Sequence, residues 1–176
     1  IRRLSRANNQ VQQGVASWER IEEILYAVPQ IQDPLLAYPL PPVKGRVRFE
    51  GVAFSYSPDR PVLDGIDITI EPTETVALVG LSGAGKTTIV NLLTRFYDPT
   101  DGRITIDGID IREVTLASLR ARIGLVSQDI ILFNDTIRNN IAYGMVDAAS
   151  ERVEAAARAA EAHGFISDLP KGYDTP

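Results

Sequence analysis

The sequence predicts an α/β fold: a parallel sheet with helices, an antiparallel β-subdomain before it, and an amphipathic helix at the amino end. Three observations support this prediction. Short apolar runs alternate with helix-like segments after residue 75. Two earlier runs alternate apolar with polar residues, and residues 1–28 repeat apolar positions at heptad-like spacing. Strands that alternate with helices are typical of α/β proteins, and alternating runs are typical of half-exposed antiparallel strands.

The amino-terminal segment, residues 1–28, has apolar residues at Leu4, Val11, Trp18 and Leu25. This spacing indicates one amphipathic helix. Because the segment does not begin with Met, we expect it to be the end of a longer helix that arrives from elsewhere. A helix that packs on its own domain is the alternative.

Residues 29–45 follow this helix and contain five prolines. Proline removes a backbone donor and restricts the residue before it, so we expect a stiff linker here. The chain then changes to β-like runs at residues 47–56 and 62–70, with a turn at residues 57–59 between them. Their alternation predicts an antiparallel pair with one exposed face.

The rest of the chain is predicted to alternate between strands and helices. The apolar runs 76–79 and 123–127 are predicted to be buried parallel strands. A further strand is expected at residues 103–107, after a turn at 98–102. Helices are predicted at residues 88–96, 115–122, 136–142 and 150–163, the last capped by Ser150 and ended by Gly164.

The segment from Gly80 to Thr87 is a complete G-x-x-x-x-G-K-[ST] loop between an apolar run and a helix-like run. That context predicts a phosphate-binding loop. Its backbone N–H groups can converge on phosphate oxygens, and the start of the following helix favours negative charge. We expect Lys86 to bind the β- and γ-phosphates and the Thr87 hydroxyl to be a ligand of Mg²⁺. The residues predicted to bind the nucleotide here are Gly80, Ser82, Gly83, Ala84, Gly85, Lys86, Thr87 and Thr88.

Composition excludes several other classes of protein. The formal net charge is -5, and the only basic cluster is Arg2, Arg3 and Arg6. A nucleic acid is therefore not an expected partner, because phosphate backbones are held by clustered Lys and Arg. The chain has no cysteine, which excludes a disulfide framework and a thiolate metal site and suits a reducing compartment. It has no apolar run of 18 residues, so we expect no membrane span within it.

Other enzymes with a phosphate-binding loop need further motifs. The D-x-x-G and N-K-x-D motifs of guanine-specific enzymes are not in the sequence, and Arg120, Arg122 and Arg138 are too scattered for the lid of a nucleotide kinase. In this class a carboxylate at the end of an apolar strand holds the metal. The strand Ile104 to Asp107 is the nearest candidate, but it is half polar and leads into Gly108. An ordinary turn at Asp107 is the favoured interpretation.

The segments around the loop resemble the nucleotide-binding domain of ATP-binding cassette (ABC) transporters, of the exporter type fused to its own transmembrane domain. The resemblance covers residues 45–175. It implies the fold of a P-loop NTPase, with a RecA-like parallel sheet core that is incomplete in this sequence. Residues 47–56 resemble the opening strand of the family, whose aromatic residue stacks on adenine. By this resemblance Tyr56 binds the base, and the nucleotide is ATP.

The sequence Val126-Ser127-Gln128-Asp129 resembles the Q-loop of the family. This resemblance implies that Gln128 is a catalytic residue that reaches Mg²⁺ and the attacking water. The apolar stretch Ile130 to Phe133 would meet a helix of the transmembrane domain; a simply buried stretch is the alternative. His163 is not the switch histidine of the family, which follows the metal-binding carboxylate, and we expect it at a helix end.

The resemblance also implies a division of the chain. Residues 1–28 would be the cytoplasmic end of the last transmembrane helix, residues 29–45 the linker, and residues 46–176 the amino-terminal part of the cassette. The arginines near the start agree with the excess of positive charge on cytoplasmic flanks. The expected location is the cytoplasmic face of the cell membrane. The expected partners are ATP, the transmembrane domain and a second cassette.

The sequence ends before the L-S-G-G-Q signature, the aspartate and glutamate of the metal strand, and the switch histidine of the family. We therefore expect this segment to bind Mg-ATP without hydrolysing it, whereas its parent is an ATPase that couples hydrolysis to transport. Two alternatives stay open from the residues alone. One is a non-catalytic regulator that binds ATP, and the other is a different P-loop phosphotransferase.

Overall fold

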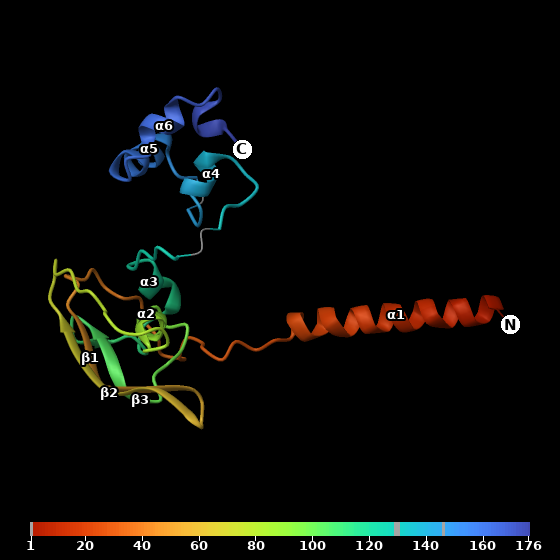
Figure 1. Ribbon diagram of the computed structural model, residues 1–176, viewed down its shortest axis with the longest axis horizontal. Coiled ribbons are helices and arrows are strands. Elements are labelled where there is room, and N and C mark those ends of the chain that lie inside the picture. The colour runs from red at the N-terminus through yellow and green to blue at the C-terminus, as the bar shows by residue number, and fades with distance from the viewer. Residues whose placement is uncertain (1, 129–130, 146) are drawn as a thin grey trace. The chain divides into compact units, whose positions relative to one another are not determined.

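The structure is a computed structural model that describes residues 2–128, 131–145 and 147–176. The chain forms two compact units, Ile1–Gly124 and Leu125–Pro176 (Figure 1). Each unit has its own cluster of buried side chains.

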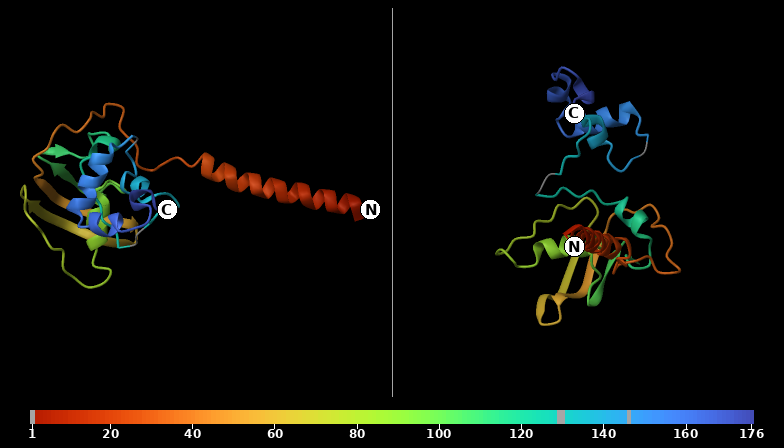
Figure 2. Two further views of the ribbon diagram at one scale, coloured as in Figure 1. Left: turned by 90° about the horizontal axis from the view of Figure 1, so that it is seen from above. Right: turned by 90° about the vertical axis from the view of Figure 1, so that its right-hand side faces the viewer.

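The first unit is built on a four-stranded sheet. Its strands are β1 (Val47–Ser57), β2 (Arg60–Ile70), β3 (Asp101–Ile106) and β4 (Ile109–Asp110), in the order β2-β1-β3-β4. Every neighbouring pair is antiparallel. The predicted antiparallel pair in front of the phosphate loop is confirmed as β1 and β2, which lie side by side in all three views (Figures 1 and 2).

A bulge in β1 brings its apolar residues onto one face. Phe49 and Val52 are both buried although they are three residues apart. Side chains of a regular strand alternate between faces, so these two would point to opposite sides without an extra residue between them. The register of β1 with β2 shifts between Phe49 and Val52. After the shift, Val52 and Phe54 follow the normal alternation.

The helix after the phosphate loop packs on this sheet. α2 (Lys86–Leu93) buries Leu92 completely, and α3 (Leu116–Arg120) buries Leu119 completely. Both leucines belong to the same core cluster as Phe49 of β1. The apolar contacts therefore fix the position of α2 relative to the strands, and with it the loop at its amino end.

The proline-rich residues 29–45 belong to the first unit and contact its core, instead of forming a free tether. Leu40 is only 3% exposed and belongs to the core cluster. Tyr38 forms an isolated parallel bridge with Val114. The prolines suit this role because an extended segment without regular helical bonds needs no donor at those positions.

The predicted amino-terminal helix is confirmed as α1 (Arg2–Leu25). Its apolar side chains Trp18, Ile21, Ile24 and Leu25 are all more than half exposed. Within residues 2–128, 131–145 and 147–176, no helix has the length and hydropathy needed to cross a membrane.

The second unit consists of short helices. These are α4 (Ile137–Ile141), α5 (Ser150–Ala159), α6 (His163–Ser167) and the 3₁₀ turn η1 (Gly172–Asp174). They enclose a small core of Val153, Ala157, Ile166 and Tyr173. Thr136 caps α4 by accepting a hydrogen bond from the Asn139 backbone N–H, as Thr does at helix starts.

The two predicted buried parallel strands were wrong for this structure. Residues 76–79 and 123–127 have no strand conformation. Val79 is 94% exposed and Val126 is 97% exposed. A parallel strand needs a neighbour to hydrogen-bond with and helices to cover both faces. Among the described residues no strand pairs with either segment, so their apolar character alone does not produce a strand.

The predicted helix 150–163 was also wrong at its carboxyl end. α5 ends at Ala159, and Glu161 adopts the left-handed conformation, with φ of 55°, that was expected of Gly164. The Ala162 N–H then donates to the Ala157 carbonyl oxygen at 2.8 Å. This early turn allows Ile166 of α6 to bury itself in the same cluster as α5. His163 lies at a helix end as expected, but at the start of α6.

Gly102 in β3 provides a test of the bulge. It has φ of +74°, and a Cβ atom there would lie 2.4 Å from the backbone oxygens of both Glu50 and Gly51. We expect Gly102→Ala to lower the free energy of unfolding by about 3 kcal/mol, since left-handed strain of about 1–2 kcal/mol adds to overpacking. Denaturant unfolding of the purified chain measures this.

The matched control is Gly108→Ala. Gly108 has φ of +85° but an added Cβ would meet no atom within 4 Å, so only the backbone strain of about 1–2 kcal/mol remains. Equal losses in the two variants would show that the bulge does not depend on close approach at Gly102.

Candidate nucleotide-binding site

The phosphate loop begins with a tight turn of the main chain. The Ala84 N–H donates to the Leu81 carbonyl oxygen at 3.2 Å. A Cβ atom at Gly80 would lie 3.3 Å from the Ala84 Cβ. The turn therefore brings the two sides of the loop close together before the chain enters α2.

Gly85 joins this turn to α2. It is the N-cap residue of the helix, with φ of 86°, a conformation that residues with a Cβ rarely adopt. A Cβ there would also lie 2.7 Å from the Leu63 Cδ2 of β2. The loop is thus seated directly against the sheet, and only glycine allows that approach.

The first turn of α2 presents free donors at this point. The initial N–H groups of a helix have no partner within the helix, and no side chain caps α2. The backbone N–H groups of Lys86, Thr87 and Thr88 are therefore available to an anion. The helix dipole adds positive potential at the same end.

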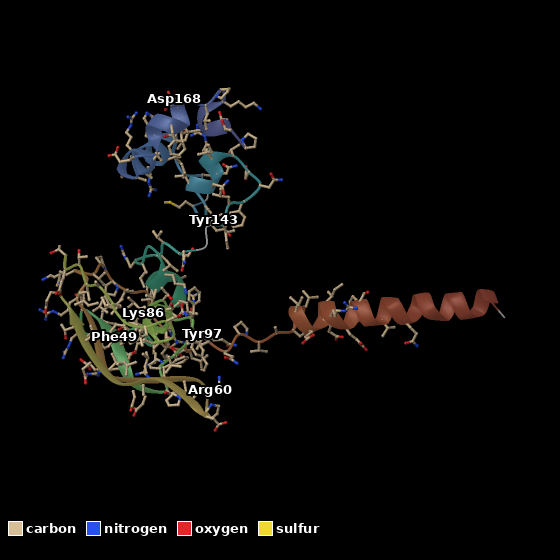
Figure 3. The ribbon with its side chains drawn as sticks, in the orientation of Figure 1. Phe49, Arg60, Lys86, Tyr97, Tyr143 and Asp168 are labelled. Carbon is tan, nitrogen blue, oxygen red and sulfur yellow. The ribbon has the colours of Figure 1, made fainter. Side chains whose placement is uncertain are left out.

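Lys86, labelled in Figure 3, is the first residue of α2, and its ammonium group contacts the loop. Its Nζ donates to the carbonyl oxygens of Gly80 at 2.8 Å and Leu81 at 2.7 Å. No carboxylate pairs with Lys86 among the ion pairs of the described residues. A positive charge held only by neutral carbonyls remains available for a phosphate.

Tyr56 lies beside the loop at the end of β1. Its hydroxyl is 3.1 Å from the Thr88 Oγ1, and Thr88 is only 4% exposed. The Tyr56 ring meets Phe54 and Tyr97 edge to face, with centroids 4.8 and 5.1 Å apart. Tyr56 is still 52% exposed, because these contacts cover only part of its ring.

These residues line one hollow of about 390 Å³, formed by Tyr56, Val62 and the loop residues 82–88. Its size is within the usual range for small-molecule sites. A larger hollow of about 680 Å³ lies beside Arg95 and Phe96 in the same unit, but no glycine-rich loop contributes to it. The structure thus brings Tyr56 and the phosphate loop together, which the sequence placed more than 20 residues apart.

The predicted residues after position 124 belong to the second unit. Gln128 is exposed. The stretch predicted to meet a transmembrane domain begins at Ile130, which lies outside the described residues; Ile131 and Leu132 are each 76% exposed, and Phe133 is 46% exposed. The alternative of a simply buried stretch is wrong for these three residues.

Asn140 orders the end of this stretch, a role that sequence reasoning missed. Its Nδ2 donates to the carbonyl oxygens of Phe133, Asp135 and Thr136, and its Oδ1 accepts from the Phe133 N–H at 2.8 Å. The signal in the sequence for these bonds is an Asn in the first helical turn after an apolar loop, because Asn side chains often bond to nearby backbone groups.

The residues at the site fit a magnesium ion that is bound mainly by the phosphate oxygens of a nucleotide. Among residues 2–128, 131–145 and 147–176, no group of three or more His, Cys, Asp or Glu side chains could hold a metal. Mg²⁺ keeps several waters and binds through one or two protein ligands plus substrate phosphates. Thr87, whose exposed side chain lies in the hollow's lining, fits this requirement.

Asp107, the carboxylate weighed as a metal ligand, is occupied by the main chain. It accepts hydrogen bonds from the backbone N–H groups of Lys44, Gly45 and Arg46. With Gly108 it forms the two-residue turn between β3 and β4, both residues having positive φ, as in Asp-Gly hairpins. The favoured interpretation as a turn is confirmed.

The hydrogen bond from Arg46 is the main cause that holds the pKa of Asp107 below its ordinary value of 3.8, and the Lys44 and Gly45 bonds act in the same direction. A carboxyl group whose pKa is lower in the folded chain stabilises it above the unfolded pKa. This contribution disappears as pH falls through the folded pKa.

We therefore expect Asp107→Asn to lower the free energy of unfolding at about pH 6 and to have a smaller effect at about pH 3. Asn tolerates the left-handed conformation, so the substitution adds no backbone strain to the difference in stability. Denaturant unfolding of both proteins at the two pH values measures the difference. A difference that does not change with pH would contradict the assigned role of the charge.

Comparisons with known proteins agree with this geometry. A family model described as ABC transporter matches residues 63–173, more than half of the chain. The chain is 51% identical over 175 residues to an ATP-dependent lipid A-core flippase of Syntrophus aciditrophicus, covering 99% of this chain and 29% of that protein. It is 48% identical over 167 residues to a fatty acid ABC transporter ATP-binding/permease protein of Mycobacterium bovis, covering 95% of this chain and 26% of that protein.

A solved structure is similar as well. A bacterial Atm1-family ABC exporter with ATP bound has a TM-score of 0.82 and 45% identity, covering 96% of this chain and 30% of that chain. This chain thus spans about 30% of the length of the relatives that it matches.

Proposed function

This chain belongs to the ABC transporter family, and we propose that it is the ATP-binding segment of an exporter whose parent couples ATP hydrolysis to transport across a membrane. One observation carries the proposal. The residues with free backbone N–H groups at the start of α2, Lys86 among them, line the same hollow as the half-exposed Tyr56.

The main chain of the loop binds the phosphates in this proposal. The N–H groups of Gly83 and of residues 85–88 donate to phosphate oxygens, and the dipole of α2 stabilises the negative charge. Lys86 exchanges its bonds to the Gly80 and Leu81 carbonyls for bonds to the β- and γ-phosphates. These charge-assisted bonds are stronger than those to neutral carbonyls.

Tyr56 binds the adenine ring by stacking. Its edge-to-face contacts with Phe54 and Tyr97 fix the orientation of the ring before ATP binds. Little side-chain conformational entropy is therefore lost on binding. Aromatic stacking contributes roughly 1 kcal/mol and makes no hydrogen bond to the base. Bases other than adenine should therefore bind with similar affinity.

Thr87 would hold the magnesium ion in this proposal. In the parent, Gln128 would reach the ion and position the attacking water. The ion neutralises charge that develops on the phosphate oxygens. The segment described here supplies the nucleotide cradle but not hydrolysis. A second cassette and the rest of the parent supply the remaining groups.

The parent places this segment at the cytoplasmic face of the membrane. Residues 1–28 continue a transmembrane helix, residues 29–45 connect it to the cassette, and residues 46–176 begin the cassette. The exposed apolar residues Ile131, Leu132 and Phe133 support a contact with the transmembrane domain, because exposed apolar groups mark interaction surfaces.

Lys86→Ala tests the phosphate site. We expect it to weaken Mg-ATP binding by about 10- to 150-fold, because a charge-assisted bond to phosphate contributes about 1.5–3 kcal/mol and each 1.4 kcal/mol is tenfold in affinity. Isothermal titration calorimetry on the purified chain measures the affinity. Lys171→Ala, which removes an exposed lysine of the second unit, is the matched control and should bind like the unmodified chain.

Tyr56 variants test the base site. Tyr56→Ala should weaken ATP binding about 5-fold, whereas Tyr56→Phe, which keeps the ring and loses only the Thr88 contact, should weaken it about 3-fold or less. Binding of inorganic triphosphate, which has no base, should stay unchanged in both variants. A loss of triphosphate affinity equal to the loss of ATP affinity would show that Tyr56 supports the loop and not the base.

A third measurement separates binding from turnover. The purified segment should release no phosphate from ATP above the rate of the Lys86→Ala variant. Turnover that disappears in that variant would show that this segment hydrolyses ATP by itself. Transfer of phosphate to a small acceptor would favour a phosphotransferase instead.

A further inference from the structure

The carboxyl end of α2, opposite the phosphate loop, is held by two arginines. Arg120 donates from its Nε to the Thr94 carbonyl at 3.1 Å and from its Nη2 to the Arg95 carbonyl at 2.9 Å. Arg95 itself is only 3% exposed and has a left-handed φ of 53°. A non-glycine residue is strained in this conformation and persists in it only where its surroundings hold it.

Arg95 uses its buried guanidinium to join four parts of the first unit. It pairs with the Asp98 carboxylate at 2.9 Å. It also donates to the carbonyl oxygens of Ile111 and Val114 at 3.4 Å and of Gln32 at 3.3 Å. A planar group with five donors can make such a junction, and a lysine cannot. The contact with Gln32 ties the end of α2 to the segment that follows α1.

That segment, residues 32–40, is docked at its two ends and is here named the strap; Leu35 and Leu36 in its middle are 104% and 92% exposed. Asp33 accepts a hydrogen bond from the Leu116 N–H at 2.7 Å, and the Leu40 N–H donates to the Ser118 Oγ at 2.8 Å. Tyr38 exchanges backbone bonds with Glu113 and Thr115 on either side of its bridge to Val114. None of these strap residues lines the hollow beside the phosphate loop.

The length of α2 connects its two ends energetically. A helix of eight residues is only marginally stable by itself, because a short helix forms too few hydrogen bonds to offset the free-energy cost of nucleation. Contacts that fix one end therefore stabilise the other. Phosphate binding at the first turn and the arginine contacts at the last turn should reinforce each other.

We propose that the strap and the phosphate loop are coupled through α2, with Arg95 as the positioning residue that joins them. ATP at the loop tightens the strap against α3, and a docked strap in turn raises the affinity for ATP, because such coupling is reciprocal. Since the strap follows α1 in the chain, the occupancy of the loop is transmitted to the segment that holds α1. The inference rests on the proposed binding of ATP at the loop.

Amide hydrogen exchange on the unmodified 176-residue chain tests the coupling, with and without saturating Mg-ATP. Exchange at the Tyr38 and Leu40 amides should slow at least about 5-fold when ATP binds. The Gly51 amide, which donates to the Asp67 carboxylate at 2.8 Å between β1 and β2, is the control for general stabilisation and should change by less than about 2-fold.

The outcomes separate this inference from the proposed function. Slowing at Gly83 and Gly85 without slowing at Tyr38 and Leu40 would overturn the coupling and leave ATP binding intact. Equal slowing at Gly51 and in the strap would overturn it as well, because the effect would then be general. No slowing anywhere would overturn ATP binding and the coupling together.

Variants of Asp33 test the reciprocal effect. Asp33→Ala removes the acceptor for the Leu116 N–H and should lower ATP affinity about 5-fold, although Asp33 does not line the hollow. Asp33→Asn keeps an acceptor oxygen and should restore the affinity. Unchanged affinity in Asp33→Ala would contradict the coupling. Ser118→Ala, which frees the Leu40 N–H, gives a second variant if Asp33→Ala melts near the temperature of the measurement.

Discussion

The burial of α2 against the sheet is the contact on which the binding site depends. Leu92 is fully buried among the strands, and Gly85 allows the loop to approach Leu63 of β2 closely. These two contacts hold the start of α2 in place, so its free N–H groups point at one hollow instead of sampling many directions. Preorganised donors bind an anion at lower entropic cost than mobile ones.

The net charge of the chain makes this local arrangement more important. With a formal net charge of -5, the protein as a whole repels a nucleotide polyanion. Attraction must come from charges close to the phosphates, because charges beyond a Debye length of about 8–10 Å are largely screened. Lys86 and the amino end of α2 are such charges. In the proposed function, affinity for a triphosphate would therefore depend on the loop residues 80–87 and not on the net charge of the surface.

Local sequence signals predicted the local structure well. The glycine-rich loop, the helix after it and the antiparallel pair β1 and β2 depend on neighbours in sequence and on alternation, which one sequence displays. The Asp-Gly turn at Asp107 was favoured for the same reason. The bulge that aligns Phe49 with Val52 was not foreseen, because it depends on the close approach of Gly102 from another strand.

The incorrect predictions all involve contacts between different elements. The runs 76–79 and 123–127 are apolar enough for buried strands, but a strand exists only where another strand pairs with it. The carboxyl end of α5 depends on the burial of Ile166 beneath it. The sequence did not reveal the role of Arg95 as a junction, because its partners come from three segments: Gln32, Asp98, and Ile111 with Val114. Spacing within one stretch of sequence contains no record of such contacts.

The most direct test of the account is an NMR titration that follows the backbone amides of the chain as Mg-ATP is added. We expect the largest shifts at Gly83, Gly85, Lys86, Thr87 and Thr88, whose N–H groups are proposed to bind the phosphates, and we expect inorganic triphosphate to reproduce them. Shifts centred elsewhere, for example on the larger hollow beside Arg95 and Phe96, would contradict the assignment of the start of α2 as the phosphate site.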